Sequence, residues 1–452
     1  MTRERTPGRA PAPGPATLAV TCIATTLALM NYTAPMLTLP AMAEAFGTPS
    51  SAQAWLLNGT PLGLAALLLV AGALADAHGR RRVFLLGTLA LGVTTVLGAF
   101  ADSTALFTAA RIAQGAASAA ILAGSLGLLA VAYPSGRDRI RATGVWGASV
   151  SGGIALGPLL AGAFSLLDWR LAYAALGAAA LVTAAAGTRV LARPAARATA
   201  GGRPDLAGAT ALALALSALL TALTLGRDGW LRPVIGVLLL VAVALTALFL
   251  LVERRAADPM IDLGLLRRPA FRASVVGALF TGLAVIGLFS VVPALIMRGA
   301  GMAPLVAAWL FVLWSGTSFV VALQARRLAG RLSAPYQLAL GFALSAAGVL
   351  ALLGALDSPD LPWPRLITGL VVAGAGSGLL NAALPRLAVD SVPPERAAMG
   401  SGANNTARYI GSAAGVALML ALSAAGPDAP VVASAVLALA GAVLTVAGSP
   451  RR

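Results

Sequence analysis

The sequence predicts an all-α integral membrane protein with about fourteen spans. The chain has 452 residues, of which 59% are hydrophobic and only 11% charged, so it is too apolar to cover a water-facing surface. Its apolar residues fall in runs of roughly 20, the length of a helix that crosses a bilayer. Without water in the hydrocarbon core the backbone must bond internally, as helices do. Arginines also concentrate in alternate loops between these runs.

The expected spans follow one another with short loops between them. Their approximate limits are residues 16–38, 52–74, 83–101, 104–132, 141–165, 171–192, 206–226, 232–252, 272–296, 304–324, 336–356, 364–386, 402–423 and 429–448. The polar, Pro-rich stretch 1–15 is too long to belong to a cleaved signal peptide, and we expect a disordered cytoplasmic tail there. Residues 449–452 form a second short tail.

The distribution of arginine predicts the orientation in the membrane. With the N-terminus inside, the inner segments carry 25 arginines and the outer loops 5. Because basic residues are retained on the cytoplasmic side, both termini are expected in the cytoplasm of a bacterial-type inner membrane. The charge of +16 is spread over many loops, which excludes the continuous basic patch of a nucleic-acid-binding protein.

The residues that carry enzyme chemistry are scarce. His78 is the one histidine and Cys22 the one cysteine, so neither a metal cluster nor a disulfide framework is expected. No phosphate-binding G-x-x-x-x-G-K-[ST] loop is present. We therefore expect no cofactor, no metal and no enzyme activity.

The loop between the second and third spans, "GALADAHGRRRVFLLG", is the first motif. Gly79 suits the tight turn that so short a loop needs, and Arg80 and Arg81 anchor the inner face. The alternative is that this loop only keeps positive charge on the cytoplasmic side of the membrane. This alternative explains the arginines but not Gly72 and Asp76.

Two arginines, Arg111 and Arg408, fall inside expected spans. A charge within a spanning helix is costly unless it faces a partner or a wet cavity, so such a residue is functional by default. In "ARIAQG" Arg111 is followed by Gln114 and Gly115. The alternative is that Arg111 lies near the outer end and extends to the interface.

The fifth span, "GVWGASVSGGIALGPLLAG", is rich in glycine. Small residues let neighbouring helices approach closely, and proline removes a helix hydrogen bond and bends the span. The motif consists of Gly144, Gly153, Gly157, Pro158 and Gly162. Glycine packing alone is common in membrane helices, whereas the Gly-Pro pair at this offset is not.

These motifs resemble those of the major facilitator superfamily, in its fourteen-span drug:proton antiporter branch. The segment "VDSVPPERAAMGSGANNTARYIGSAAG" is similar to the region around the branch's thirteenth span. The resemblance implies two six-helix bundles plus two extra spans. It also implies that Asp76 and Arg80 form part of a cytoplasmic gate, that Arg111 takes part in proton transfer, and that the fifth-span motif marks an exporter.

The implied organisation divides the chain into six parts. They are a tail at 1–15, an N-terminal bundle at 16–192, a linker with two extra spans at 193–252, a cytoplasmic interfacial connector at 253–271, a C-terminal bundle at 272–448 and a tail at 449–452. Six spans on either side of the extra pair agree with an internal repeat, which alternating access requires.

The chain departs from the branch at the acid of the first span. Asn31 stands where relatives carry Asp, and Thr60 where they carry Tyr. No other Asp or Glu lies in the middle of an expected span, although proton exchange needs a carboxylate that responds to its surroundings. A neutral or anionic substrate is therefore favoured over a cation. The candidate cavity residues are Asn31, Tyr32, Thr33, Trp55, Asn58, Asn405 and Arg408.

The expected function is secondary active export of a small organic compound, a drug, antibiotic or metabolite, by alternating access and driven by proton antiport. The expected partners are this small molecule, protons as the coupling ion and the lipid bilayer, and the protein is expected to be a monomer. One alternative is an uncoupled or importing facilitator of a polar metabolite. A membrane sensor or enzyme is the least favoured alternative. It would need a catalytic cluster or a sizeable soluble domain, and the sequence shows neither.

Overall fold

The computed structural model describes residues 14–49, 52–133, 135–165, 167–192, 206–226, 229, 231–255, 263–299, 302, 304–329, 331–356, 362–423 and 425–447. The tail at 449–452 and the linker residues 193–205 therefore lie outside the described residues, and the tail at 1–15 and the connector at 253–271 lie partly outside them. Every regular element of the described part is helical, which confirms the all-helical expectation.

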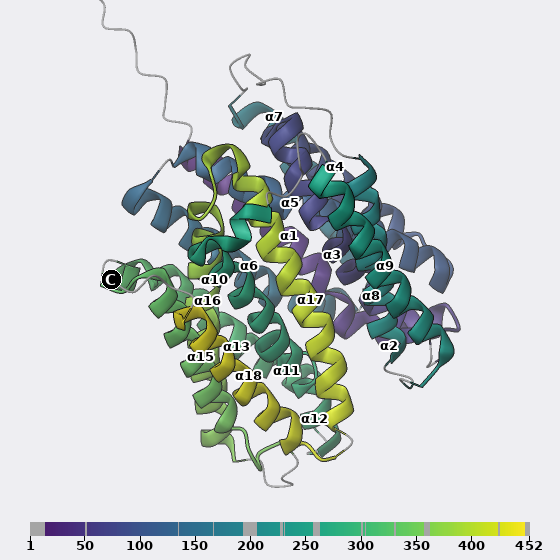
Figure 1. The fold of residues 1–452 in the computed structure, drawn as a ribbon. Helices are drawn as coiled ribbons and strands as arrows, with labels where there is room; N and C mark the ends of the chain where they lie inside the picture. The colour runs from purple at the N-terminus through teal and green to yellow at the C-terminus, as the bar shows by residue number, and fades with distance from the viewer. Residues whose placement is uncertain are drawn as a thin grey trace, which may run out of the picture.

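The first half of the chain forms a group of packed helices (Figure 1). They are α1 (Gly14–Thr33), α2 (Pro35–Ala45), α3 (Gln53–His78), α4 (Arg80–Ala99), α5 (Thr104–Ala132), α6 (Gly136–Ser165) and α7 (Trp169–Val190). The helices α8 (Leu206–Gly226) and α9 (Pro233–Arg255) follow as a hairpin at one edge of the molecule.

The second half begins with the short η1 (Leu263–Arg267) and ends with α18 (Asp428–Ala447). Between them lie α10 (Pro269–Phe280), η2 (Thr281–Ile286), α11 (Gly287–Phe289), α12 (Val292–Gly299), α13 (Pro304–Gln324), α14 (Arg326–Ala329), α15 (Ala334–Leu350), α16 (Trp363–Asp390), η3 (Pro394–Arg396) and α17 (Ala397–Ser423). In Figure 1, α17 runs along the centre of the molecule.

Eleven helices of the described part are long and apolar enough to cross a membrane. The three remaining expected spans fall on shorter apolar stretches, at Thr210–Leu223, Trp309–Gln324 and Ala334–Leu350. In the most apolar 18-residue stretch of α9, only 17% of the residues are buried inside the protein, and Leu240 and Val243 are exposed. Such a helix is covered by lipid rather than by protein.

Two expected spans are interrupted. The first one turns at Ala34, because Pro35 begins α2 and lacks the amide hydrogen that a continuous helix would use. The span expected at 272–296 contains the π-helix η2 and then a turn before α12. A π-helical segment within an α-helix often marks a functional site, and η2 does line a cavity described below.

The loops at one end of the molecule hold most of the described arginines, and we call this the basic end. It carries Arg80, Arg81, Arg82, Arg137, Arg139, Arg141, Arg189, Arg254, Arg255, Arg267, Arg268, Arg327, Arg331 and Arg396. Helices α3, α5, α7, α9, α13 and α16 end there, and α4, α6, α10, α15 and α17 begin there. The other end of the bundle is the opposite end.

Each half has its own apolar core. In the first half Leu64, Phe84 and Trp146 are fully buried, and in the second Phe289, Phe342 and Leu380. Across the boundary, α17 packs on α3 and α5, and α6 packs on α13 and α16. The residues that bring the halves together therefore lie on α3, α5, α6, α13, α16 and α17.

Candidate functional site

Asp76, near the end of α3, joins the two halves at the basic end. Its Oδ1 accepts hydrogen bonds from Nε of Arg80 at 2.9 Å and from the backbone amide of Ala398 at 3.3 Å. Its Oδ2 accepts one from the amide of Met399 at 2.8 Å. The first amides of a helix have no partner within it, and the helix dipole favours a negative charge there. The carboxylate therefore binds the first turn of α17.

Arg80 extends this contact. It donates to the carbonyl oxygen of Gly127 on α5 at 3.2 Å and to that of Pro394, just before α17. Gly79 precedes it with a φ of 97°, a conformation that glycine adopts without strain. The glycine turn thus places Arg80 at the start of α4, where it reaches both halves of the chain.

Gly72 explains how α3 comes so close to α17. A Cβ at Gly72 would lie 2.5 Å from the carbonyl oxygen of Ala398, and one at Gly402 would lie 2.6 Å from that of Leu68. These distances are too short for any side chain. Arg81 has a different role, because it donates to the carbonyl oxygens of Thr188 and Leu191 at the end of α7.

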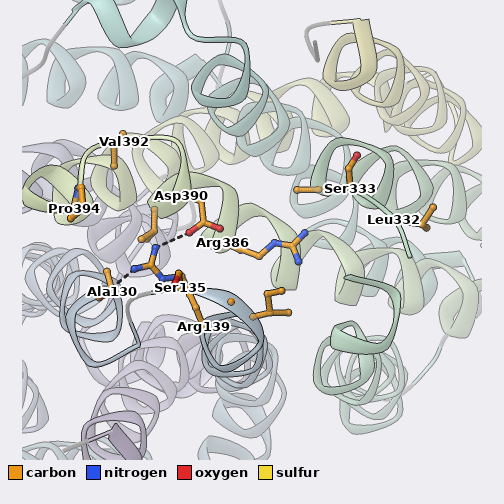
Figure 2. A pocket seen from close by; sticks show the side chains of 13 residues that line it. Ala130, Ser135, Arg139, Leu332, Ser333, Arg386, Asp390, Val392 and Pro394 are labelled. Atoms are coloured by element: carbon orange, nitrogen blue, oxygen red, sulfur yellow. Dashed lines mark hydrogen bonds and ion pairs between the residues drawn. The ribbon is translucent and has the colours of Figure 1, made fainter. Parts of the chain in front are cut away.

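A second ion pair crosses the basic end between α6 and α16. Arg139 Nη1 lies 2.8 Å from Asp390 Oδ1 (Figure 2). Arg139 also donates to the carbonyl oxygens of Ala130 and Tyr133. The pair borders a cavity of about 600 Å³ between the halves, which Arg386 and Ser333 also line.

Arg111 is buried in the first half and does not reach the membrane interface. Its exposed fraction is 0%, so the alternative of an extended interfacial arginine is wrong. Its Nη1 donates to the backbone oxygen and Oδ1 of Asn31, at 2.8 and 2.7 Å, and to Oε1 of Gln114 at 2.9 Å. Its Nη2 donates to the carbonyl oxygen of Tyr32 at 3.3 Å. All of these acceptors are neutral.

The glycines of α6 bring this helix against α1. A Cβ would lie 2.6 Å from the oxygen of Thr26 at Gly153 and 2.2 Å from Oγ1 of Thr33 at Gly157. Gly162 continues the contact towards α2, and Gly144 faces α13 more loosely. Pro158 lies within the same helix. The motif therefore forms the close contact between α1 and α6 beside the central cavity.

The central cavity lies between the halves and is bounded by α1, α2, α6, η2, α11, α13, α16 and α17. Its lining contains no Asp or Glu among the residues that the structure describes. These residues are Leu29, Tyr32, Thr33, Met36, Ser151, Ile154, Thr281, Val285, Ile286, Phe289, Ser290, Phe311, Trp314, Ser315, Ser318, Ser377, Asn381, Arg408 and Tyr409. The cavity measures about 40 Å³, so this conformation is almost closed around it.

Serines and one asparagine connect the halves at this cavity. Ser151 and Ser318 hydroxyls lie 2.9 Å apart, and Ser315 donates to the carbonyl oxygen of Ser151. Asn381 Nδ2 donates to Ser151 Oγ at 3.0 Å. Since hydroxyls both donate and accept, this contact can be exchanged for bonds to a ligand or to water.

Two aromatic rings form the apolar side of the cavity. Phe289 and Trp314 are stacked with their centroids 4.3 Å apart and an interplanar angle of 12°. Nε1 of Trp314 is buried and has no acceptor within the described part of the protein. A buried donor without a partner is costly.

Arg408 lies on the same cavity and differs from Arg111. Its side chain is buried, with an exposed fraction of 6%, and its Nε has no acceptor. Among the described residues, none forms a hydrogen bond or an ion pair with its guanidinium group. Gly282 lets η2 pack directly on the backbone of α17 at Arg408, because a Cβ at Gly282 would lie 2.0 Å from the carbonyl oxygen of Arg408.

The other expected cavity residues are dispersed. Tyr32 and Thr33 line the central cavity, whereas Asn58 lines a neighbouring one, which Tyr32 and Tyr409 separate from it. Asn31 binds Arg111 instead, and its Nδ2 donates to Thr95. Asn405 donates within its own helix, to Ser401. Neither it nor Trp55 lines a described cavity.

Sequence reasoning did not find the serine contact, the aromatic pair or the ion pair between Arg139 and Asp390. Serine and other small residues are frequent in these helices, so no pattern distinguishes Ser151 or Ser318. Asp390 lies just after the span expected at 364–386, and no motif distinguishes it. Its contact with Arg139 joins residues 251 positions apart.

A family model described as Major Facilitator Superfamily matches residues 21–416, with a second match at 274–452. The chain is 31% identical to "Multidrug resistance protein Stp" of Mycobacterium tuberculosis (strain CDC 1551 / Oshkosh), over 86% of this chain and 72% of that protein. It is 32% identical to "Puromycin resistance protein pur8" of Streptomyces alboniger, over 90% and 81%.

A third relative is "Cephamycin export protein CmcT" of Amycolatopsis lactamdurans, which is 31% identical over 90% of this chain and 85% of that protein. Among solved structures, the human organic anion transporter MFSD10 (TETRAN) superposes with a TM-score of 0.67, covering 97% of this chain and all of that one. At 19% identity this likeness shows the fold alone.

Proposed function

The chain belongs to the major facilitator superfamily, and from this premise we propose that it exports a small organic compound, a drug, antibiotic or metabolite, by alternating access. It is a secondary active transporter and not an enzyme. The observation that carries the proposal is the central cavity, which residues of both halves line and which contacts between the halves close from the basic end. The resistance and export proteins that it resembles support the direction of transport.

We propose that the basic end faces the cytoplasm and that the contact between Asp76 and α17 is the inner gate. In this conformation the gate is closed, because Asp76, Arg80 and the pair of Arg139 and Asp390 join the halves there. On the opposite side the cavity lining includes Met36 and Ser290, which are exposed. These two observations support our proposal that this conformation is nearer to the outward-facing state of the cycle than to the inward-facing one.

We propose proton antiport as the driving reaction. The cavity lining has no carboxylate, so the proton sites nearest to the moving surfaces among the described residues are Asp76 and Asp390 at the basic end. Protonation of Asp76 would neutralise the charge that the first turn of α17 binds, which weakens the closed gate. Arg111 would act by holding α1 to α5, and Gln114 by supporting Arg111 and by holding α5 to α4.

The remaining proposals concern architecture. We propose fourteen spans, made of the eleven long helices and the three shorter apolar ones, arranged as two six-helix bundles with α8 and α9 as the extra pair. The protein would be a monomer in a bacterial-type inner membrane, with both termini in the cytoplasm.

The test is accumulation of labelled antibiotics and metabolites by cells that lack or contain the protein. Export predicts lower accumulation in cells that contain it, and proton coupling predicts that an ionophore abolishes the difference. Higher accumulation in the expressing cells would favour the importing facilitator. A difference that survives the ionophore would retain the exporter and remove proton antiport from the proposal.

A further inference from the structure

Arg408 places a buried positive charge on the central cavity without a counter-charge. Its exposed fraction is 6%, and the described residues provide neither an ion pair nor a hydrogen bond to its guanidinium group. The described residues of the cavity lining include no acid. Burying a cation without a partner is unfavourable, so an uncompensated arginine at a transport cavity is best explained by a partner that arrives with the substrate.

Arg111 cannot serve as this anion site. Its terminal nitrogens already donate to the oxygens of Asn31, Gln114 and Tyr32, and it is fully enclosed in the first half. Of the two buried arginines in the middle of the molecule, Arg408 is the one whose terminal nitrogens remain available.

The rest of the lining indicates what accompanies the anion. Phe289 and Trp314 present stacked rings beside the cavity, and aromatic surfaces bind planar apolar groups. Trp314 Nε1 is a second buried donor for which the described part of the chain supplies no acceptor. Both unpaired groups are donors, and a ligand rich in acceptor oxygens would satisfy them.

We propose that the central cavity binds an aromatic organic anion, a carboxylate or sulfonate, with Arg408 as the residue that receives its charged group. This inference rests on the proposed transport function and specifies its substrate class. The space of about 40 Å³ is too small for such a ring. Binding therefore requires the halves to separate, and the serine contact between Ser151 and Ser318 is one that would open.

The test uses three ligands that share one ring system and differ in charge: 1-naphthylacetate, 1-naphthylacetamide and 2-(1-naphthyl)ethylammonium. Equilibrium binding to the purified full-length protein is measured for each. We expect the anion to bind the wild type most tightly. Tighter binding of the cation or the amide than of the anion would overturn the proposal. The absence of binding by all three ligands would overturn it as well.

The variants Arg408→Met and Arg408→Lys separate charge from shape. Loss of a charge-assisted hydrogen bond predicts about a tenfold to hundredfold weaker binding of the anion by Arg408→Met, with the amide unchanged. Arg408→Lys keeps the charge but not the planar fork, so it should retain part of the affinity. Equal losses for anion and amide would mean that Arg408 shapes the cavity, and would refute its role as the anion site.

The control variant is Arg82→Met, which removes the same charge from an exposed position at the basic end and should leave all three affinities unchanged. The accumulation experiment above distinguishes the two proposals. Cells that exclude only cationic compounds would leave the exporter function standing and would refute the substrate class. Failure to exclude any compound would instead remove the proposed function.

Discussion

Arg111 and Arg408 are both buried, and they differ in what surrounds them. Arg111 is bound on its terminal nitrogens by neutral oxygens of α1 and α5, whereas Arg408 has no such partner among the described residues and borders the cavity. In both, Nε has no hydrogen-bond partner among the residues that the structure describes, so the terminal nitrogens make the difference. A satisfied buried charge holds helices together, and an unsatisfied one is available for a ligand.

The largest effect on stability is expected at Arg111. Arg111→Met would leave the oxygens of Asn31 and Gln114 without their donor, and each unpaired buried acceptor costs about 1–3 kcal/mol. We expect a loss of about 3 kcal/mol in the free energy of unfolding, measured by urea or heat unfolding in detergent. If this variant were as stable as the wild type, the distinction would fail, because the bonds of Arg111 would then contribute no more to the stability of the fold than Arg408 does.

Asp76, the proposed gate residue, should give the next largest effect, and this effect is on transport. Asp76→Asn removes the negative charge at the first turn of α17 and weakens the bond to Arg80. A helix-end charge in a partly buried site contributes up to about 2 kcal/mol, so we expect roughly tenfold slower efflux from vesicles with little change in protein level.

Asp390→Asn is the matched control for the gate. Its carboxylate also pairs with an arginine across the halves, but the side chain is 44% exposed, and such pairs contribute about 0–1 kcal/mol. Efflux should therefore fall less than in Asp76→Asn. The opposite order would assign the gate to α6 and α16.

Asn31→Asp should have the smallest effect on stability, and it tests how strongly the charge of Arg111 contributes to its contact with α1. The substitution would place a carboxylate where Asn31 Oδ1 now lies 2.7 Å from Arg111 Nη1. It would also remove the donor to Thr95. The charge-assisted bond exceeds the lost one by about 1 kcal/mol, so a slight rise in melting temperature is expected. A clear fall would mean that the bond to Thr95 outweighs the charge of Arg111.

The sequence predicted the helices and the glycine turn before Arg80 because local rules govern them. Apolar runs of spanning length correspond to the helices, and Gly79 has the positive φ that its short loop required. It could not predict that Asn31 faces Arg111 rather than the cavity, because that contact joins residues 80 positions apart. Ser151, Ser318 and the rings of Phe289 and Trp314 gave no signal, since only packing brings them together.

Thermal unfolding tests the central claim most directly. It is measured for the wild type, Arg111→Met and Arg408→Met, each with and without 1-naphthylacetate. The claim is that one buried arginine holds the fold and the other receives the substrate. We expect Arg111→Met to melt well below wild type. Arg408→Met should melt near wild type and lose the ligand's stabilising shift. An Arg408→Met protein that melts far below wild type, or that keeps the full shift, would contradict the claim.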